Sequence, residues 1–212
     1  MQNDTLQLNS VLYANVSPAG AYYVVSNKEQ NTSRAFLSSV LIHGVQEPLT
    51  TDNLLAWSEC QDTETALSLL YRLQRLEFIY GTEKPRQVDT SNLEQRLPGI
   101  LKQLSGTGRA LLADENGLYY AGVGFDHESA EEISALAGDV VTLSERHSSL
   151  LKNNLDLNPN AWSVCDPTGQ SELAFFSLFF NENNFMLVTG GKPQLQNSSF
   201  VDLVEILYHR YG

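Results

Sequence analysis

The spacing of apolar residues is clearest in the second half of the chain, where it changes from strand to helix and back. Two β-prone runs flank Asn116-Gly117, a dipeptide that tolerates the positive φ values of a tight turn. In chain order we predict a helix over about 91–105, strands at 109–114 and 118–125, a long helix at 128–150, strands at 161–166, 172–180 and 185–191, and a helix at 200–211 capped by Ser198 or Ser199.

The first half is predicted to begin with two short strands and to continue with three helices. The strands are expected near 6–14 and 20–26, on either side of a Ser-Pro-Ala-Gly turn. The helices are expected near 33–41, with Phe36, Leu37, Val40 and Leu41 on one face, at 51–58 after Thr50 or Thr51, and at 63–76 after Asp62, followed by a strand at 78–80. The polar stretch 81–91 holds a Gly and a Pro and predicts a boundary between domains 1–86 and 91–212.

The second domain carries a family resemblance in its hairpin, ALLADENGLYYAGVG, and in the Ala-rich helix that follows, SAEEISALAGDVVTLSERHSSLL. Residues of about 91–212 resemble a roadblock/dynein-light-chain domain. One departure is Pro98-Gly99, which lies farther from the first strand than in the family pattern. The resemblance implies an α+β fold with a five-stranded antiparallel sheet, the long helix on one face and the terminal helices on the other. It also implies a dimeric scaffold or regulator of small Ras-like GTPases, without catalytic residues of its own.

The long helix predicts self-association independently of the resemblance. Its apolar residues are spaced 3, 4, 3, 4 and 3 apart, which is a heptad pattern, at Ile133, Leu136, Val140, Leu143, His147 and Leu150. Small residues beside this row, including Ala137, are expected to permit close approach. We therefore predict a homodimer interface formed by Ile133, Leu136, Ala137, Val140, Leu143 and His147. The alternative is that the whole apolar arc packs inside one chain.

Charge and motifs narrow the function classes. The chain has 13 basic and 25 acidic residues, a formal charge of -12, which disfavours broad binding to nucleic acid or anionic membranes. We find no P-loop, GxSxG, HExxH or EF-hand pattern, and predict no catalytic residue, cofactor or metal site. Cys60 and Cys165 lack CxxC spacing and are expected to be buried thiols. With neither a secretory signal nor a membrane span, we expect a soluble cytoplasmic protein.

The first domain leaves an alternative function open. Residues 49–81 resemble a winged helix, since a short helix, a turn, a longer helix and a strand follow one another. DNA contacts would come from Arg72 and Arg75 on the third helix and from Lys84 and Arg86 in the wing, although Asp62 and Glu64 make the start of that helix acidic.

We therefore predict a non-enzymatic dimeric regulator or scaffold that docks or modulates a small Ras-like GTPase. The first alternative is a transcription regulator whose winged helix binds DNA and whose second domain dimerises or senses a ligand. The second alternative is a sensor of a small metabolite, since small α/β sheets of this kind also bind such ligands.

Overall fold

The computed structural model describes residues 6–44, 46–86 and 93–212. Residues 87–91 of the predicted domain boundary, and the first residues of the helix predicted at 91–105, lie outside this range. The N-terminal half comprises β1 (Tyr13–Val16), α1 (Pro18–Val25), α2 (Thr32–Ser39), a π-helical segment η1 (Val40–Gly44), α3 (Thr51–Ser58), α4 (Thr63–Arg75) and β2 (Ile79–Thr82). The C-terminal half comprises α5 (Leu93–Gln103), β3 (Ala110–Asp114), β4 (Tyr119–Val123), α6 (His127–Arg146), a π-helical segment η2 (Ser149–Asn154), β5 (Ala161–Cys165), β6 (Ser171–Phe180), β7 (Asn183–Gly190) and α7 (Ser198–Tyr211).

The C-terminal half is built on a five-stranded antiparallel sheet with strand order β4-β3-β7-β6-β5. β5, β6 and β7 form the predicted meander, and β3 joins it by pairing with β7. The turn between β3 and β4 places Gly117 at a φ of 79°, a left-handed value that glycine adopts without steric cost. The predicted α+β class and the five-stranded sheet flanked by helices are confirmed.

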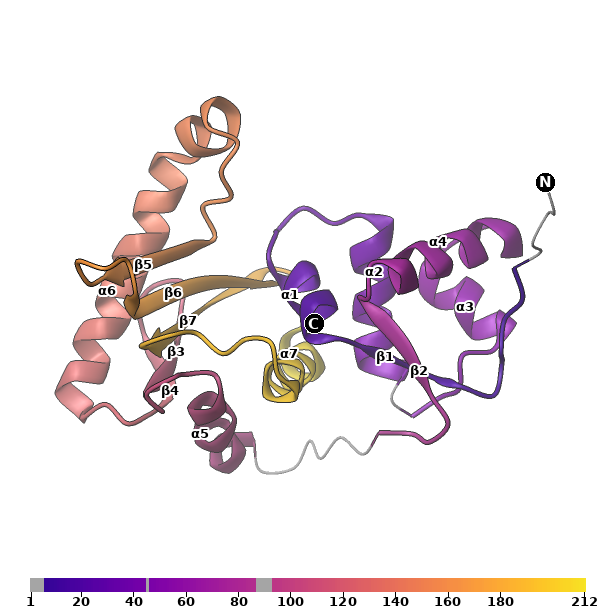
Figure 1. The fold of residues 1–212 in the computed structure, drawn as a ribbon, viewed down its shortest axis with the longest axis horizontal. Coiled ribbons are helices and arrows are strands. Elements are labelled where there is room, and N and C mark those ends of the chain that lie inside the picture. Colours follow the sequence, from indigo (N-terminus) through magenta and orange to yellow (C-terminus); the bar gives the residue numbers. More distant parts are fainter. Residues whose placement is uncertain (1–5, 45, 87–92) are drawn as a thin grey trace.

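Both faces of this sheet are covered, because apolar side chains alternate along the central strands. On β3, Leu111 and Ala113 pack beneath α6, whereas Ala110 and Leu112 join the core on the opposite face. α6 lies on one face of the sheet, and α1, α5 and α7 lie on the other (Figure 1). A two-sided sheet of this kind needs near-continuous apolar strands, which the runs in β6 and β7 supply.

The strand predicted near 20–26 is wrong, because α1 occupies this segment. The Ser17 hydroxyl accepts a hydrogen bond from the Gly20 amide at 3.1 Å, and Pro18 stands in the first turn of the helix. This Ser-Pro start favours a helix and prevails over the β propensity of the Tyr and Val residues that follow. Gly20 is required by close packing, since a Cβ there would stand 2.3 Å from the Phe78 carbonyl oxygen.

The three helices predicted in the N-terminal half are present as α2 with η1, α3 and α4. Thr50 and Asp62 cap α3 and α4 by accepting hydrogen bonds from the Asn53 and Thr65 amides at 3.1 and 2.8 Å. β2 pairs antiparallel with β1, a strand that precedes all the helices of this half. The winged-helix resemblance of this half stays a prediction.

The two halves share one buried core. α1 packs against both β6 and α7, and η1 also contacts α7. The rings of Tyr22 on α1 and Phe200 on α7 lie 6.2 Å apart between centroids. The Asn160 side-chain amide donates to the Ser26 carbonyl, and Arg86 forms ion pairs with α7. The segments predicted as separate domains are therefore in extensive apolar contact.

Candidate interaction surface on α6 and β5

The predicted long helix is α6, which ends at Arg146 rather than at Leu150 and is followed by η2. Asp126 caps its start by accepting hydrogen bonds from the Ser129 amide at 2.9 Å and the Ser129 hydroxyl at 2.8 Å. These bonds hold the pKa of the Asp126 carboxyl below its usual value. The cap fixes where the helix begins, and so fixes which side chains face the sheet.

The sheet-facing side of α6 is made of small residues. Ala130, Ser134, Ala137 and Val141 are buried, and the Trp162 indole of β5 donates to the Ser144 hydroxyl at 2.5 Å. The expectation that Ala137 and its small neighbours permit approach of a partner is therefore wrong. They let α6 lie close to its own sheet, because small side chains shorten the distance at which a helix can pack.

The hairpin turn also touches this helix. A Cβ at Gly117 would stand 2.7 Å from the Ser134 carbonyl oxygen, and one at Gly138 would stand 3.2 Å from the Gly117 amide nitrogen. Glycine on both sides of the contact lets the turn and the helix backbone meet. This contact orients α6 across the sheet from the β3–β4 end.

Large apolar residues are exposed on the opposite side of α6 and on η2. The exposed fractions of Leu136, Leu143 and Leu150 are 43%, 39% and 47%. His147 is exposed beside them, whereas Ile133 and Val140 are half-buried against the sheet core. Of the six residues predicted at the interface, three are therefore exposed: Leu136, Leu143 and His147.

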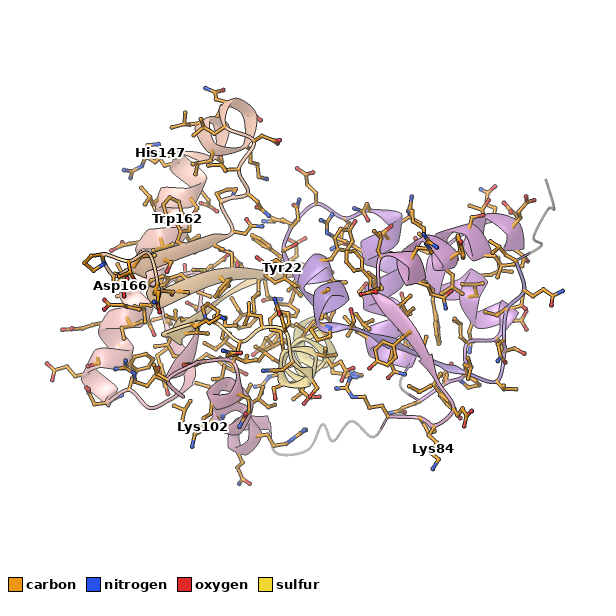
Figure 2. The ribbon with its side chains drawn as sticks, viewed as in Figure 1. Tyr22, Lys84, Lys102, His147, Trp162 and Asp166 are labelled. Carbon is orange, nitrogen blue, oxygen red and sulfur yellow. The ribbon has the colours of Figure 1, made fainter. Side chains whose placement is uncertain are left out.

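An edge strand lies beside this row of leucines. β5 pairs with β6 on one side and ends the sheet order, so its other side is an edge. The hydrogen bond from Trp162 to Ser144 places β5 next to the second half of α6. Val164 on β5 is 50% exposed, and the preceding loop carries the exposed residues Leu155 and Leu157. Figure 2 shows His147, Trp162 and Asp166 along this side of the molecule.

The cysteines do not lie where the sequence predicted. Cys165 is exposed on β5 and Cys60 is half-exposed after α3, so the expectation of two buried thiols is wrong. Within the described ranges, no cluster of three or more His, Cys, Asp or Glu residues could hold a metal ion. Among the helices that the structure describes, none is long and apolar enough to cross a membrane.

The residues named for the DNA-binding alternative are dispersed and partly engaged. Arg72 donates to the Ser33 hydroxyl at 2.9 Å. Arg86 pairs with Asp202 and, at 3.0 Å, with Glu205. Arg75 and Lys84 are exposed. Of the four cations, Arg86 is therefore held in ion pairs with α7, whereas Arg72, Arg75 and Lys84 are exposed.

Sequence reasoning missed the buried carboxyl of Glu205. Its side chain is 1% exposed, and burial raises its pKa to about 7 despite the nearby Arg86 guanidinium. One of its carboxyl oxygens is buried without a hydrogen-bond partner within the described part of the chain. The sequence shows Glu205 among apolar residues of a helix, which indicates a buried carboxyl. It does not indicate the partner, because Arg86 lies 119 positions away.

Comparisons with known proteins give a likeness to a solved structure. No protein-family model matches the chain, and no curated protein matches it. Among solved structures, the chain is similar to the crystal structure of a Roadblock/LC7 domain from Streptomyces avermitilis. The TM-score is 0.39 and the identity 17%, over 57% of this chain and 96% of that chain.

Proposed function

We propose that this chain is a non-enzymatic interaction module that forms a homodimer through α6 and β5 and docks a small Ras-like GTPase. The observation that carries the proposal is the row of exposed leucines on α6, which lies beside the free edge of β5. The GTPase is the partner class implied by the resemblance of residues 91–212 to roadblock domains.

The energetics favour covering this row. Burying an apolar side chain stabilises by about 1.5–3 kcal/mol relative to full exposure, so covering a leucine that is already half-buried contributes about 1 kcal/mol. In a two-fold dimer both copies of each leucine are buried, one on each protomer, so the gain in free energy is doubled. The described part of the chain leaves Leu136, Leu143 and Leu150 39–47% exposed, which argues against packing of the whole arc within one protomer.

The edge strand adds a second element to the same interface. An edge strand presents unpaired backbone N–H and C=O groups, which pair readily with another strand. Two copies of β5 related by a two-fold axis would run antiparallel and extend the sheet across the dimer. Each α6 would then lie on the same face of a continuous sheet, next to its symmetry mate.

Acidic residues surround the leucine row and support a basic partner. Glu131, Asp139 and Glu145 are exposed on α6. Such charges raise the association rate of a protein with a complementary surface. They also repel nucleic acid, and the engagement of Arg86 with Asp202 and Glu205 further weakens the transcription-regulator alternative.

Light scattering tests the dimer. The wild type is expected at about twice the monomer mass, and Leu136→Glu with Leu143→Glu at the monomer mass, because charge would enter a desolvated interface. Both positions are exposed, so the variant should fold normally. Val140 is a poor choice for this test, since its side chain packs on the sheet. Val11→Glu, on an exposed residue of the N-terminal half, is the matched control and should remain dimeric. A wild-type monomer at high concentration would refute the dimer.

Affinity capture tests the GTPase. The full chain should serve as bait, because its two halves share a core. Lysate from the native organism is loaded with a non-hydrolysable GTP analogue or with GDP. Recovery of a small GTPase by the wild type, with a clear preference between the nucleotides, is the expected result. Recovery of DNA and no GTPase in either state would replace this proposal with the transcription-regulator alternative.

A further inference from the structure

A cavity of about 530 Å³ lies where the two halves of the chain meet. Its walls come from four segments far apart in the sequence: the start of α1, the residues after α4, the middle of β6 and the loop before α7. Tyr22, which lines it, lies between the five-stranded sheet and the N-terminal helices (Figure 2). The volume is in the range of small-molecule sites, and such sites are frequent at junctions of this kind.

The walls are mainly apolar. Tyr22 and Phe176 supply aromatic rings, and Pro18, Leu76 and Leu195 supply aliphatic surface. Leu76 is 53% exposed although it follows directly on the buried face of α4. An occupant of the cavity would therefore cover apolar area that the folded chain leaves in contact with water.

One wall is held firmly in place by hydrogen bonds across the cavity rim. The Ser17 hydroxyl donates to the Glu77 carbonyl oxygen at 2.6 Å, and the Ser17 amide donates to the Phe78 carbonyl oxygen at 2.9 Å. Glu77 has a φ of 57°, a left-handed value that is uncommon outside glycine. These bonds tie the end of α4 to the start of α1, so the site is largely formed before any ligand binds.

The charge of the lining is one-sided. Among the described residues that line the cavity, Glu77 is the one acidic residue, and no Lys, Arg or His is present. The Tyr22 phenol is uncharged near neutral pH, and burial raises its pKa further. A carboxylate repels phosphate and carboxylate ligands and attracts a cation. Aromatic faces add to the attraction, because a cation interacts favourably with their π electrons.

We propose that this cavity binds a small apolar amine. The hydrocarbon or aromatic body packs against Tyr22, Phe176 and Leu76, and the ammonium group is drawn to the Glu77 carboxylate. Because its walls come from both halves, such a ligand bridges them and stabilises their arrangement. The site is separate from the α6 and β5 surface, so this inference holds whether or not a dimer forms.

Three probes with the same ring but different charge test the proposal. Tryptamine is a cation, 3-methylindole is neutral and indole-3-acetate is an anion at neutral pH. By calorimetry with the full chain, tryptamine should bind about tenfold more tightly than 3-methylindole, and indole-3-acetate more weakly than both. Absence of tryptamine binding, or equal binding of the cation and the anion, would overturn the proposal.

Two variants locate the binding in this cavity. Glu77→Gln should reduce tryptamine binding to the level of 3-methylindole and leave 3-methylindole unaffected. Glu64→Gln makes the same charge change on an exposed residue of α4 outside the cavity and should have no effect. An equal loss in both variants would show non-specific attraction to an acidic protein and would refute the site. Circular dichroism confirms that each variant is folded.

Discussion

Helices α6 and α7 flank the same sheet, but they distribute their apolar residues in opposite ways. α7 is buried along nearly its whole length, from Phe200 to Tyr208, because the sheet, α5, α1 and η1 surround it. α6 buries a stripe of small residues and turns Leu136 and Leu143 outward, and Leu150 is exposed on η2. Contacts within the chain bury most apolar residues of α7, whereas they leave the outer leucines of α6 exposed. This difference is the reason that the proposed interface is placed on α6 and not on α7.

The largest expected effect comes from emptying the core around α7. Phe200 is fully buried and contacts Tyr22 across the junction of the two halves. Phe200→Ala should lower the free energy of unfolding by about 3–5 kcal/mol, because it removes apolar burial and leaves a cavity. Urea denaturation monitored by fluorescence measures the change. A loss below about 1 kcal/mol would mean that the junction is not a packed core.

The ion pair between Arg86 and α7 should contribute less, and in a pH-dependent way. Arg86→Met leaves the buried Glu205 without its cation and should lower the free energy of unfolding by about 2–3 kcal/mol at pH 8.5. The pKa of Glu205 in the folded chain is about 7. At pH 5.5 the carboxyl is therefore largely protonated, and the loss should be much smaller. An equal loss of unfolding free energy at both pH values would contradict a Glu205 pKa near 7.

Glu205→Gln is the matched control for the pH dependence of the Arg86→Met variant. Its pKa rises from 4.5 to about 7 on folding, so the folded state binds a proton more tightly than the unfolded state. This contribution to stability is present below pH 4.5 and is lost as the pH rises through about 7. Glu205→Gln should remove that pH dependence. The difference in the free energy of unfolding between the variant and the wild type should therefore favour the variant more at pH 8.5 than at pH 5.5.

A smaller effect is expected at the start of α7. Asn197 caps this helix by accepting from the Phe200 amide at 3.3 Å, and its side-chain amide donates to the Gln103 carbonyl oxygen at 2.9 Å. Asn197→Ala should lower the free energy of unfolding by about 1 kcal/mol. Ser198→Ala is the control and should have almost no effect. A larger loss for Ser198→Ala than for Asn197→Ala would show that Ser198 is the cap, as the sequence predicts.

The smallest effect is expected on the outer face of α6. Leu143→Ala should change the stability of the monomer by less than about 0.5 kcal/mol, because the side chain is a surface residue there. Thermal unfolding at low protein concentration, where association is weakest, measures this. If the loss approached that of Phe200→Ala, the leucine would be a core residue and the contrast between the helices would fail.

Much of the fold could be predicted from local patterns. The Asn-Gly turn, the strand runs and the caps Thr50 and Asp62 identified their elements, because each depends on neighbouring residues. The segment 20–26 is an exception, because its Tyr and Val residues favour a strand while Ser17 and Pro18 start a helix. At α7 the cap is Asn197 rather than Ser198 or Ser199, a shift within the usual uncertainty of helix ends.

The candidate site could be predicted only in part. Helical spacing identified Leu136 and Leu143, but spacing alone does not say which stripe faces the helix's own sheet. Ala137 was therefore assigned to the wrong side. Arg86 and Glu205 were not paired, because nothing local connects residues separated by 119 positions. The cavity beside Glu77 depends on four distant segments and has no sequence signal.

The contact between α1 and α7 also sets the order of events during synthesis. α1 is translated early, yet the helix that covers it begins at Ser198. At about 5–20 residues per second, a ribosome needs about 10–35 seconds to add the intervening chain. Throughout that interval the apolar face of α1 lacks its final cover. The N-terminal half therefore reaches its final packing only after α7 has left the ribosome.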